Sequence, residues 1–130
     1  MRNMSFAATQ QQILDQTKMV TRRIGWRFLK PGDIIQPVNK CQGLKAGEHP
    51  VKLGCPIRVK NVTRQTLLKI DNVEVIAEGF YMLPDDFVKM FMAMNCCSAQ
   101  SEVTRIEYEY TDPLIKYRGE KWYGVGWQEL

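Results

Sequence analysis

The stretch of residues 104–110 constrains the fold most, because its side chains alternate without a break between two characters. Ile106, Tyr108 and Tyr110 share one parity with Thr104, whereas the residues between them are charged. A period of two predicts a β-strand with one buried face. The two tyrosines are therefore expected to pack beside Ile106 in a core, and this strand is the clearest in the chain.

Weaker patterns predict further strands in the same sheet. Residues 57–60 and residues 73–77 both carry apolar side chains at alternate positions. Residues 34–36 follow a turn signal at residues 31–33, and Pro37 is expected to confine their strand to an edge or a bulge. Residues 122–127 predict a short final strand, and the Gly- and Pro-bearing residues 40–55 predict a long surface loop.

Two segments predict helices. Thr9 and Gln12 have the spacing of a capping box, which predicts a helix over residues 10–16 that buries Ile13 and Leu14. Pro84 suits the first turn of a second helix, in which apolar residues recur at positions 87, 88, 91 and 92. We expect one domain over residues 1–130 with an α+β fold. A small, partly closed β-barrel with two main helices fits best, and a ferredoxin-like α+β sandwich is the alternative.

The positive charge is concentrated at one end of the chain. Residues 1–30 contain six basic side chains against Asp15 alone, whereas the other hundred residues contain 12 basic and 13 acidic ones. Such asymmetry favours an anionic partner, nucleic acid being the usual one, although a solvated helix end would show the same pattern.

The remaining composition narrows the location and the cofactors. No segment has the apolar core of a signal peptide or the length of a membrane span, so a cytoplasmic protein with reduced cysteines is expected. A zinc site from Cys41, His49 and Cys55 fits none of the usual tight spacings, and buried free cysteine explains them better. We expect no metal and no organic cofactor.

The segment KMVTRR, residues 18–23, could carry chemistry. A threonine hydroxyl becomes nucleophilic when a base takes its proton, and a lysine of lowered pKa can be that base. The neighbouring arginines and burial would both lower the pKa of Lys18. Lys18 and Thr21 can cooperate only if the chain bends between them, where a helix gives way to a strand. Glu74 and Glu78 are the carboxylates that could complete the site.

Several segments together resemble the ASCH-domain family, in particular its short phage and prophage members. They are SFAATQQQILDQTKMVTRR, LKPGD, KCQGLKAGE, IRVKNV, EVIAEGF, FVKMF and VTRIEYEY, which span about Ser5 to Tyr110. The resemblance implies a PUA-like β-barrel with a cleft lined by Lys18 and Arg23. Gln16 stands where the family signature has glycine, and this departure is expected to narrow or stiffen the turn into the cleft.

Some small ASCH proteins are acetylcytidine amidohydrolases that use a lysine, a threonine three residues later and a distant glutamate. The resemblance assigns these roles to Lys18, Thr21 and Glu78, the glutamate by its place just before the second helix. The expected function is binding of RNA or a modified nucleoside, and the alternative is hydrolysis of an N-acylated cytidine. A ribonuclease-type or protein-interaction role has little direct support.

Other residues are expected to extend this ligand site. Arg23 should line the cleft, whereas Arg22 is predicted to be a surface charge or a phosphate contact. Trp26 could stack on a base or cap the core. Lys45, in the long loop, could continue a phosphate track or be simply solvated. A monomer in the cytoplasm, that of the host if a phage encodes the chain, is the expected state.

Overall fold

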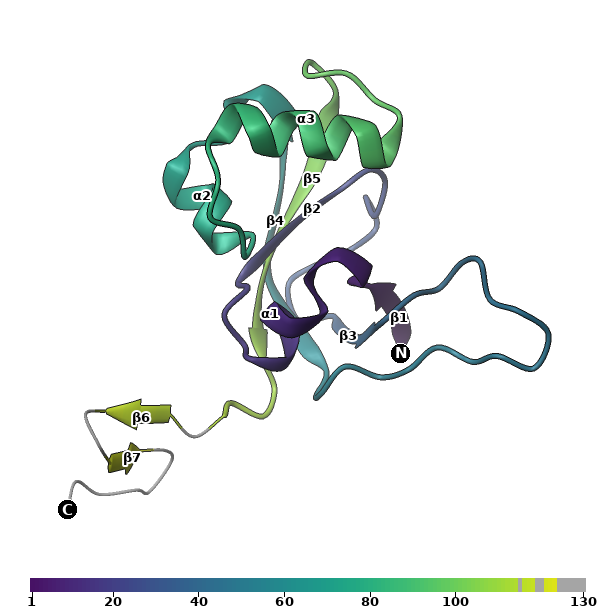
Figure 1. The fold of residues 1–130 in the computed structure, drawn as a ribbon, viewed down its shortest axis with the longest axis vertical. Coiled ribbons are helices and arrows are strands. Elements are labelled where there is room, and N and C mark those ends of the chain that lie inside the picture. Colours follow the sequence, from purple (N-terminus) through teal and green to yellow (C-terminus); the bar gives the residue numbers. More distant parts are fainter. Residues whose placement is uncertain (115, 119–120, 124–130) are drawn as a thin grey trace.

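The computed structural model describes residues 1–114, 116–118 and 121–123, and it has an α+β architecture with a mixed sheet and three α-helices (Figure 1). The strands are β1 (Arg2–Ser5), β2 (Val20–Arg23), β3 (Ile34–Val38), β4 (Ile57–Thr66), β5 (Glu102–Tyr110), β6 (Lys116–Arg118) and β7 (Lys121–Tyr123). The helices are α1 (Gln10–Leu14), α2 (Asn72–Ala77) and α3 (Pro84–Asn95), with 3-10 turns at Ala7–Thr9 and Leu67–Lys69.

The main sheet has five strands in the order β1-β3-β4-β5-β2. β1 pairs with β3 in parallel, and the other neighbours are antiparallel. The two long central strands, β4 and β5, are joined by the segment that contains α2 and α3. The strands predicted from residues 57–60 and 104–110 are thus confirmed, as is extended backbone after Lys18.

The sheet is open in the described residues. The edge strands β1 and β2 are only four residues long and do not pair with each other, so no ladder closes the sheet. α1 occupies the connection between these two strands (Figure 1). The predicted α+β class is confirmed, whereas the expected closure into a barrel is not found in this part of the chain.

Three local predictions were wrong. Residues 73–77 belong to α2 rather than to a strand, because the Asp71 side chain caps the helix by accepting the Glu74 N–H at 2.9 Å. The Thr9 side chain makes no capping bond, α1 ends at Leu14, and that leucine is 44% exposed. Pro37 lies in β3, which is an inner strand. β3 pairs with β4 only at Ile34 and Ile35, so the missing N–H of Pro37 costs no hydrogen bond to β4.

Other local predictions were right. Pro84 is in the first turn of α3, and the residues at positions 87, 88 and 91 of that helix are buried. The loop 40–55 projects from the body of the protein (Figure 1). β6 and β7 form a separate two-stranded sheet. β7 includes the first two residues of the strand predicted over residues 122–127, and residues 124–130 lie outside the described residues.

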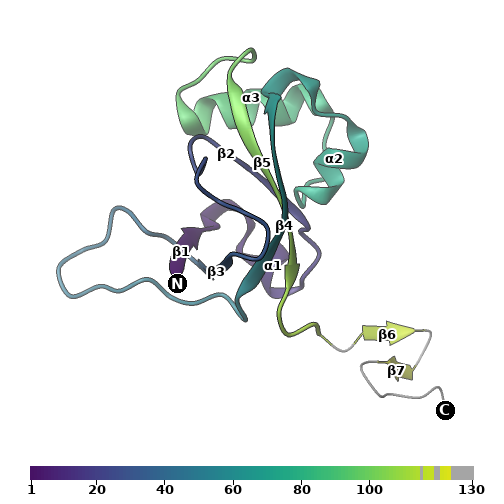
Figure 2. The ribbon, with the colours of Figure 1, turned by 180° about the vertical axis from the view of Figure 1, so that it is seen from behind.

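Two hydrophobic clusters stabilise the fold. The lower core lies where β1, β3 and α1 meet the central strands, and the upper core lies beneath α2 and α3 (Figure 2). The lower core contains Met4, Phe6, Ile13, Leu29, Ile35, Leu53, Ile57, Val59, Ile106, Tyr108 and Tyr110. The upper core contains Leu67, Ile70, Val75, Phe87, Val88, Phe91 and Val103. The long strands β4 and β5 contribute to the two cores at different points along their length.

Two negative findings concern the described residues only. None of their helices has the length and apolar character needed to span a membrane. They hold no cluster of three or more His, Cys, Asp or Glu side chains suited to a metal ion, and the four cysteines are free thiols.

Candidate ligand-binding cleft

The turn between α1 and β2 directs Lys18 and Thr21 to one site. Gln16 has φ 59°, a left-handed backbone conformation that favours glycine, and the chain reverses direction there. The Gln16 side chain holds the turn by donating to the Asp112 carbonyl at 3.0 Å and accepting the Leu114 N–H at 2.8 Å. The chain therefore turns at Gln16, before Lys18, and not between Lys18 and Thr21 as expected.

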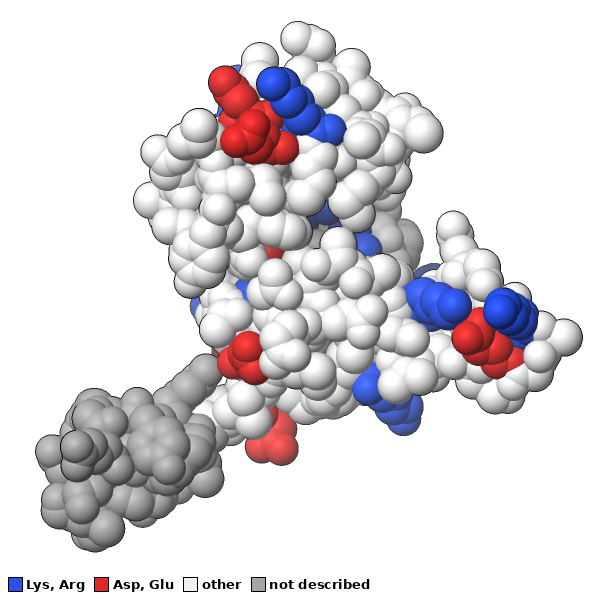
Figure 3. Space-filling view, in the orientation of Figure 1, with Lys and Arg blue, Asp and Glu red and all other residues white. Residues whose placement is uncertain are grey.

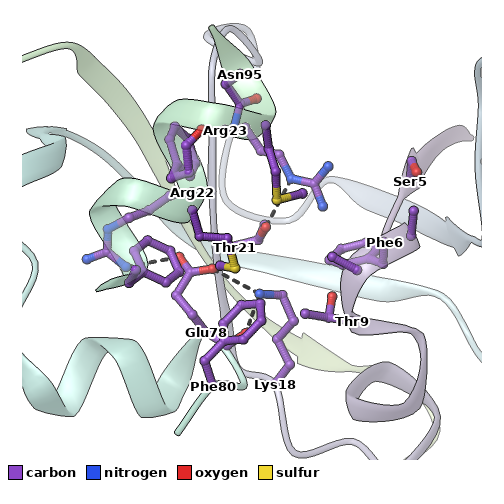
Figure 4. Close-up of a pocket in the computed structure, with 16 residues that line it drawn as sticks. Ser5, Phe6, Thr9, Lys18, Thr21, Arg22, Arg23, Glu78, Phe80 and Asn95 are labelled. Carbon is purple, nitrogen blue, oxygen red and sulfur yellow. Dashed lines mark hydrogen bonds and ion pairs between the residues drawn. The ribbon is translucent and has the colours of Figure 1, made fainter. Parts of the chain in front are cut away.

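Lys18 is almost completely buried, with 2% of its surface exposed. Its Nζ donates to Glu78 Oε1 at 2.9 Å and to the Glu78 carbonyl at 2.5 Å, and it lies 5.9 Å from the centre of the Phe80 ring (Figure 4). Burial lowers the pKa of Lys18, and the Glu78 carboxylate opposes this effect. The two arginines also lower the pKa, as predicted, but burial is the larger cause.

Arg22 is buried too, so its prediction as a surface charge was wrong. Its guanidinium donates to Glu78 Oε2 at 3.0 Å and to Glu74 Oε1 at 2.6 Å. Glu74 accepts two further bonds from Arg105, which lower the pKa of Glu74 to about 2. The cause of the burial is α2, which is a helix rather than a strand and brings both carboxylates over β2.

Arg23 differs from Arg22 in having no carboxylate within ion-pair distance among the described residues. Its Nε donates to Thr21 Oγ1 at 3.0 Å, and its guanidinium lies 4.6 Å from the centre of the Phe6 ring. Thr21 is buried, and no hydrogen bond joins it to Lys18 in the described part of the chain. The Arg23 N–H groups other than Nε are thus available to a ligand.

These side chains line one cleft between the lower and upper cores, with a volume of about 170 Å³. Figure 3 shows the corresponding notch between two lobes, with coloured atoms of charged residues inside it. Its lining is Ser5, Phe6, Ala7, Ala8, Thr9, Lys18, Thr21, Arg22, Arg23, Glu78, Phe80, Phe87, Met90, Phe91, Met94 and Asn95. Three cations against one carboxylate leave the lining with two excess positive charges.

The predicted site residues are only partly brought together. Lys18, Thr21, Arg22, Arg23 and Glu78 line the cleft. In contrast, Trp26 packs against the lower core and beside Phe28, at 5.4 Å between ring centres, and Lys45 is exposed on the long loop. Neither of these two residues is in the lining.

Other lining residues had no prediction. Phe6, Thr9 and Phe80 form walls of the cleft, and Asn95 lies near its rim (Figure 4). Phe80 follows Glu78 by two residues, so its nearness in sequence to a predicted site residue could have indicated that it lines the cleft. For Thr9, the capping-box spacing indicated a local role, which concealed its place in the site.

Two anchors set the width of the cleft. The Gln12 side chain donates to the Gly79 carbonyl at 3.0 Å, and the Met19 N–H donates to the Ala77 carbonyl at 2.8 Å. Gly79 has φ 97°, and a Cβ added to it would lie only 3.1 Å from the Cγ of Gln12. The cleft is therefore held by contacts between the end of α2 and the α1–β2 segment.

Comparisons with known proteins identify a similar fold without a function. No protein-family model matches the sequence, and no curated protein matches it. The crystal structure of protein EF3133 from Enterococcus faecalis, described under the family name DUF984, is similar, with a TM-score of 0.60. The sequence identity is 13%, and the match covers 90% of this chain and 83% of that chain. At this identity the likeness concerns the fold alone.

Proposed function

We propose that the cleft binds a single nucleoside or nucleotide. The observation that carries the proposal is that excess positive charge and aromatic side chains line the same cleft. The half-buried Phe80 offers a ring surface for a base, and the Arg23 guanidinium, which has no carboxylate partner among the described residues, suits a phosphate or another electron-rich group. Lys18 and Glu78 supply a donor and an acceptor for the edge of a base.

The charges outside the cleft favour a small ligand over an RNA strand. Binding along a nucleic-acid backbone requires unpaired basic side chains on the surface. Several exposed cations instead face carboxylates, as the pairs Arg27–Glu102, Lys40–Glu48 and Arg58–Glu109 illustrate. The site volume, about 170 Å³, also suits one ring system rather than several nucleotides.

The resemblance to ASCH proteins supports the same proposal. Lys18 and Arg23, the two residues that match the family signature, both line the cleft. Gln16 has the left-handed conformation that suits glycine, the residue that the signature has at this position. On this proposal the open five-stranded sheet would be the family's PUA-like sheet, a relation that a closer solved relative would test.

Calorimetric titration with cytidine monophosphate and with a ten-nucleotide single-stranded RNA tests the proposal. We expect the mononucleotide to bind, and Arg23→Gln to weaken its binding roughly 10-fold or more through loss of a charge-assisted bond. Lys45→Gln is the matched control outside the cleft. Binding of RNA alone, with a steep dependence on salt, would favour RNA as the ligand over a mononucleotide. Binding of neither probe would refute both the nucleotide-binding and the RNA-binding hypothesis.

A second candidate is hydrolysis of an N-acylated nucleoside, favoured by the Lys18–Glu78 ion pair beside Thr21. Neutral Lys18 would accept the Thr21 proton, Oγ1 would attack the acyl carbon, and the Arg23 N–H groups other than Nε would stabilise the charge that develops on the carbonyl oxygen. The amide C–N bond would then break, and the proton would pass through Glu78 to the leaving amine. Water would hydrolyse the threonine ester, releasing a carboxylic acid.

Incubation with acetylcytidine tests this candidate. We expect release of cytidine and acetate by the wild type, and loss of turnover in both Lys18→Met and Thr21→Val. Mass spectrometry of the quenched protein should detect an acetyl group on Thr21 if deacylation is slower than acylation. Binding of acetylcytidine without turnover would leave the binding proposal standing and remove the hydrolytic one.

A further inference from the structure

The three buried threonines of the described chain differ in what their hydroxyls contact. The Thr104 hydroxyl donates to the Gly25 carbonyl at 2.5 Å, and the Thr21 oxygen accepts the Arg23 Nε–H at 3.0 Å. Thr9 is also buried, with 5% of its surface exposed, yet its side chain makes no hydrogen bond within the described residues. Buried polar groups are nearly always paired, and valine would fill the same volume without a hydroxyl. The Thr9 hydroxyl therefore has its partner outside the described fold.

The unpaired hydroxyl opens onto the cleft. Thr9 is one of the lining residues, and its oxygen is not completely enclosed by protein atoms. In Figure 4 this oxygen points into the cleft beside Phe6. Thr9 ends the 3-10 turn that follows Phe6, and its N–H donates to the Phe6 carbonyl at 3.0 Å. The guanidinium carbon of Arg23 lies 4.6 Å from the centre of the Phe6 ring. The contacts of Phe6 thus place Thr9 and Arg23 in the same part of the cleft.

The polar groups near Thr9 are mostly donors without acceptors. The two terminal nitrogens of Arg23 have no partner in the described chain, and the Thr21 hydroxyl keeps its proton free because its oxygen is the acceptor. Each Glu78 oxygen already accepts a charged bond from another residue of the lining. Burial lowers the pKa of Arg23, and an anion beside the guanidinium would oppose this effect. This part of the cleft therefore suits a ligand group that has several acceptor oxygens and carries negative charge.

We propose that Thr9 is a ligand-binding residue whose hydroxyl, together with the Arg23 guanidinium, donates hydrogen bonds to the phosphate oxygens of a bound nucleotide. This inference rests on the proposed function and narrows its ligand from a nucleoside or nucleotide to the phosphorylated form. A phosphate presents several oxygens, so it can accept from a hydroxyl and a guanidinium at once. A nucleoside without phosphate lacks these acceptors and would leave both donors unpaired.

The test compares Thr9→Val with Thr104→Val, each of which keeps the side-chain shape and removes one buried hydroxyl. Titration calorimetry with cytidine monophosphate and with cytidine measures affinity, and thermal unfolding without ligand measures stability. We expect wild type to bind the monophosphate about 10-fold or more tightly than cytidine. Thr9→Val should bind the monophosphate roughly 3- to 10-fold more weakly, with unchanged binding of cytidine and a melting temperature that is unchanged or raised. Thr104→Val should melt a few degrees lower, since it loses a bond present in the free protein, and should keep the wild-type affinity.

The other outcomes overturn the inference. Unchanged affinity for the monophosphate in Thr9→Val would show that the hydroxyl does not contact the ligand, and an equal loss for cytidine would move its contact to the base or the sugar. A melting temperature lowered as much as in Thr104→Val would show that the hydroxyl is bonded inside the fold. If wild type binds cytidine as tightly as the monophosphate, this inference fails and the proposed function stands. If wild type binds neither probe, both fail.

Discussion

The cleft and the loop 40–55 are both basic, and they use the same residue types in opposite ways. In the cleft, Lys18 and Arg22 are buried and bonded to carboxylates on α2 and just after it. In the loop, Lys45 and Lys52 are exposed, and Lys40 pairs with Glu48 at the surface. A buried charge must have a partner to be tolerated, whereas an exposed one is stabilised by water.

This difference distinguishes a built site from a charged surface. The buried pairs connect segments that are far apart in sequence. Lys18 precedes Glu78, and Arg22 precedes Glu74, by more than fifty residues. Lys18, Arg22 and Glu78 line the cleft between the lower and upper cores. The cleft therefore depends on the fold for its geometry, and the fold depends on the cleft residues for part of its stability.

Replacing Arg22 by Met should have the largest effect, because it leaves the buried Glu78 carboxylate and Glu74 short of a partner. We expect a loss of about 3–5 kcal/mol in the free energy of unfolding, measured by urea denaturation. Lys40→Met, which breaks an exposed pair in the loop, is the control and should cost at most about 1 kcal/mol. Equal losses of unfolding free energy in the two variants would mean that burial does not make the ion pairs of the cleft stronger than the exposed pair of the loop.

Gly79→Ala should have the next largest effect. Gly79 at the cleft and Gly47 in the loop both have left-handed backbones, with φ 97° and φ 80°, so alanine is strained by about 1 kcal/mol at each. Only at Gly79 would the new Cβ also press on Gln12, at 3.1 Å, and displace the anchor of the cleft. We expect urea denaturation to show roughly 1 kcal/mol more destabilisation for Gly79→Ala than for Gly47→Ala. A smaller loss at Gly79 would contradict a tightly held anchor.

Much of the scaffold follows from short-range patterns. The alternation of residues 104–110 and Pro84 at the start of a helix predicted β5 and α3, because each pattern agrees with its tertiary setting. The strand predicted for residues 73–77 was wrong because these residues form the short helix α2, whose apolar side chains are not on one face. Val75 is buried whereas Val73 and Ile76 are exposed, and the Asp71 cap sets the conformation.

The lining of the cleft was predicted in part, and its pairing was not. Lys18 and Thr21 were named from the sequence segment that contains them, Glu78 as a candidate carboxylate, and Arg23 from the resemblance to ASCH proteins, and all four line the cleft. The role of Arg22 depends on α2 covering β2, which no local pattern encodes.

Acid should weaken the cleft network through Glu74. The pKa of Glu74 falls from 4.5 to about 2 on folding, chiefly because of its bonds to Arg105, so the folded state favours the ionised form. The contribution is present above pH 4.5 and is lost as the pH falls toward 2. We expect about 1 kcal/mol, since partial exposure screens the charges.

The measurement is the difference in unfolding free energy between wild type and Glu74→Gln across this range. That difference should shrink as the pH falls, because the protonated wild type comes to resemble the variant. A difference independent of pH would mean that Glu74 acts through packing instead of charge.

The smallest effect is expected for Lys45→Gln, which removes one positive charge from the loop. Lys45 is exposed and lies outside the cleft lining, so we expect a change of less than about 0.5 kcal/mol in unfolding free energy and unchanged affinity for cytidine monophosphate. The same variant should leave the dependence of affinity on salt unchanged, because a single charge in water contributes mainly through screened, long-range attraction. A weaker salt dependence in Lys45→Gln than in wild type would place this lysine near a ligand phosphate. The loop would then be part of the site, and burial would no longer mark its boundary.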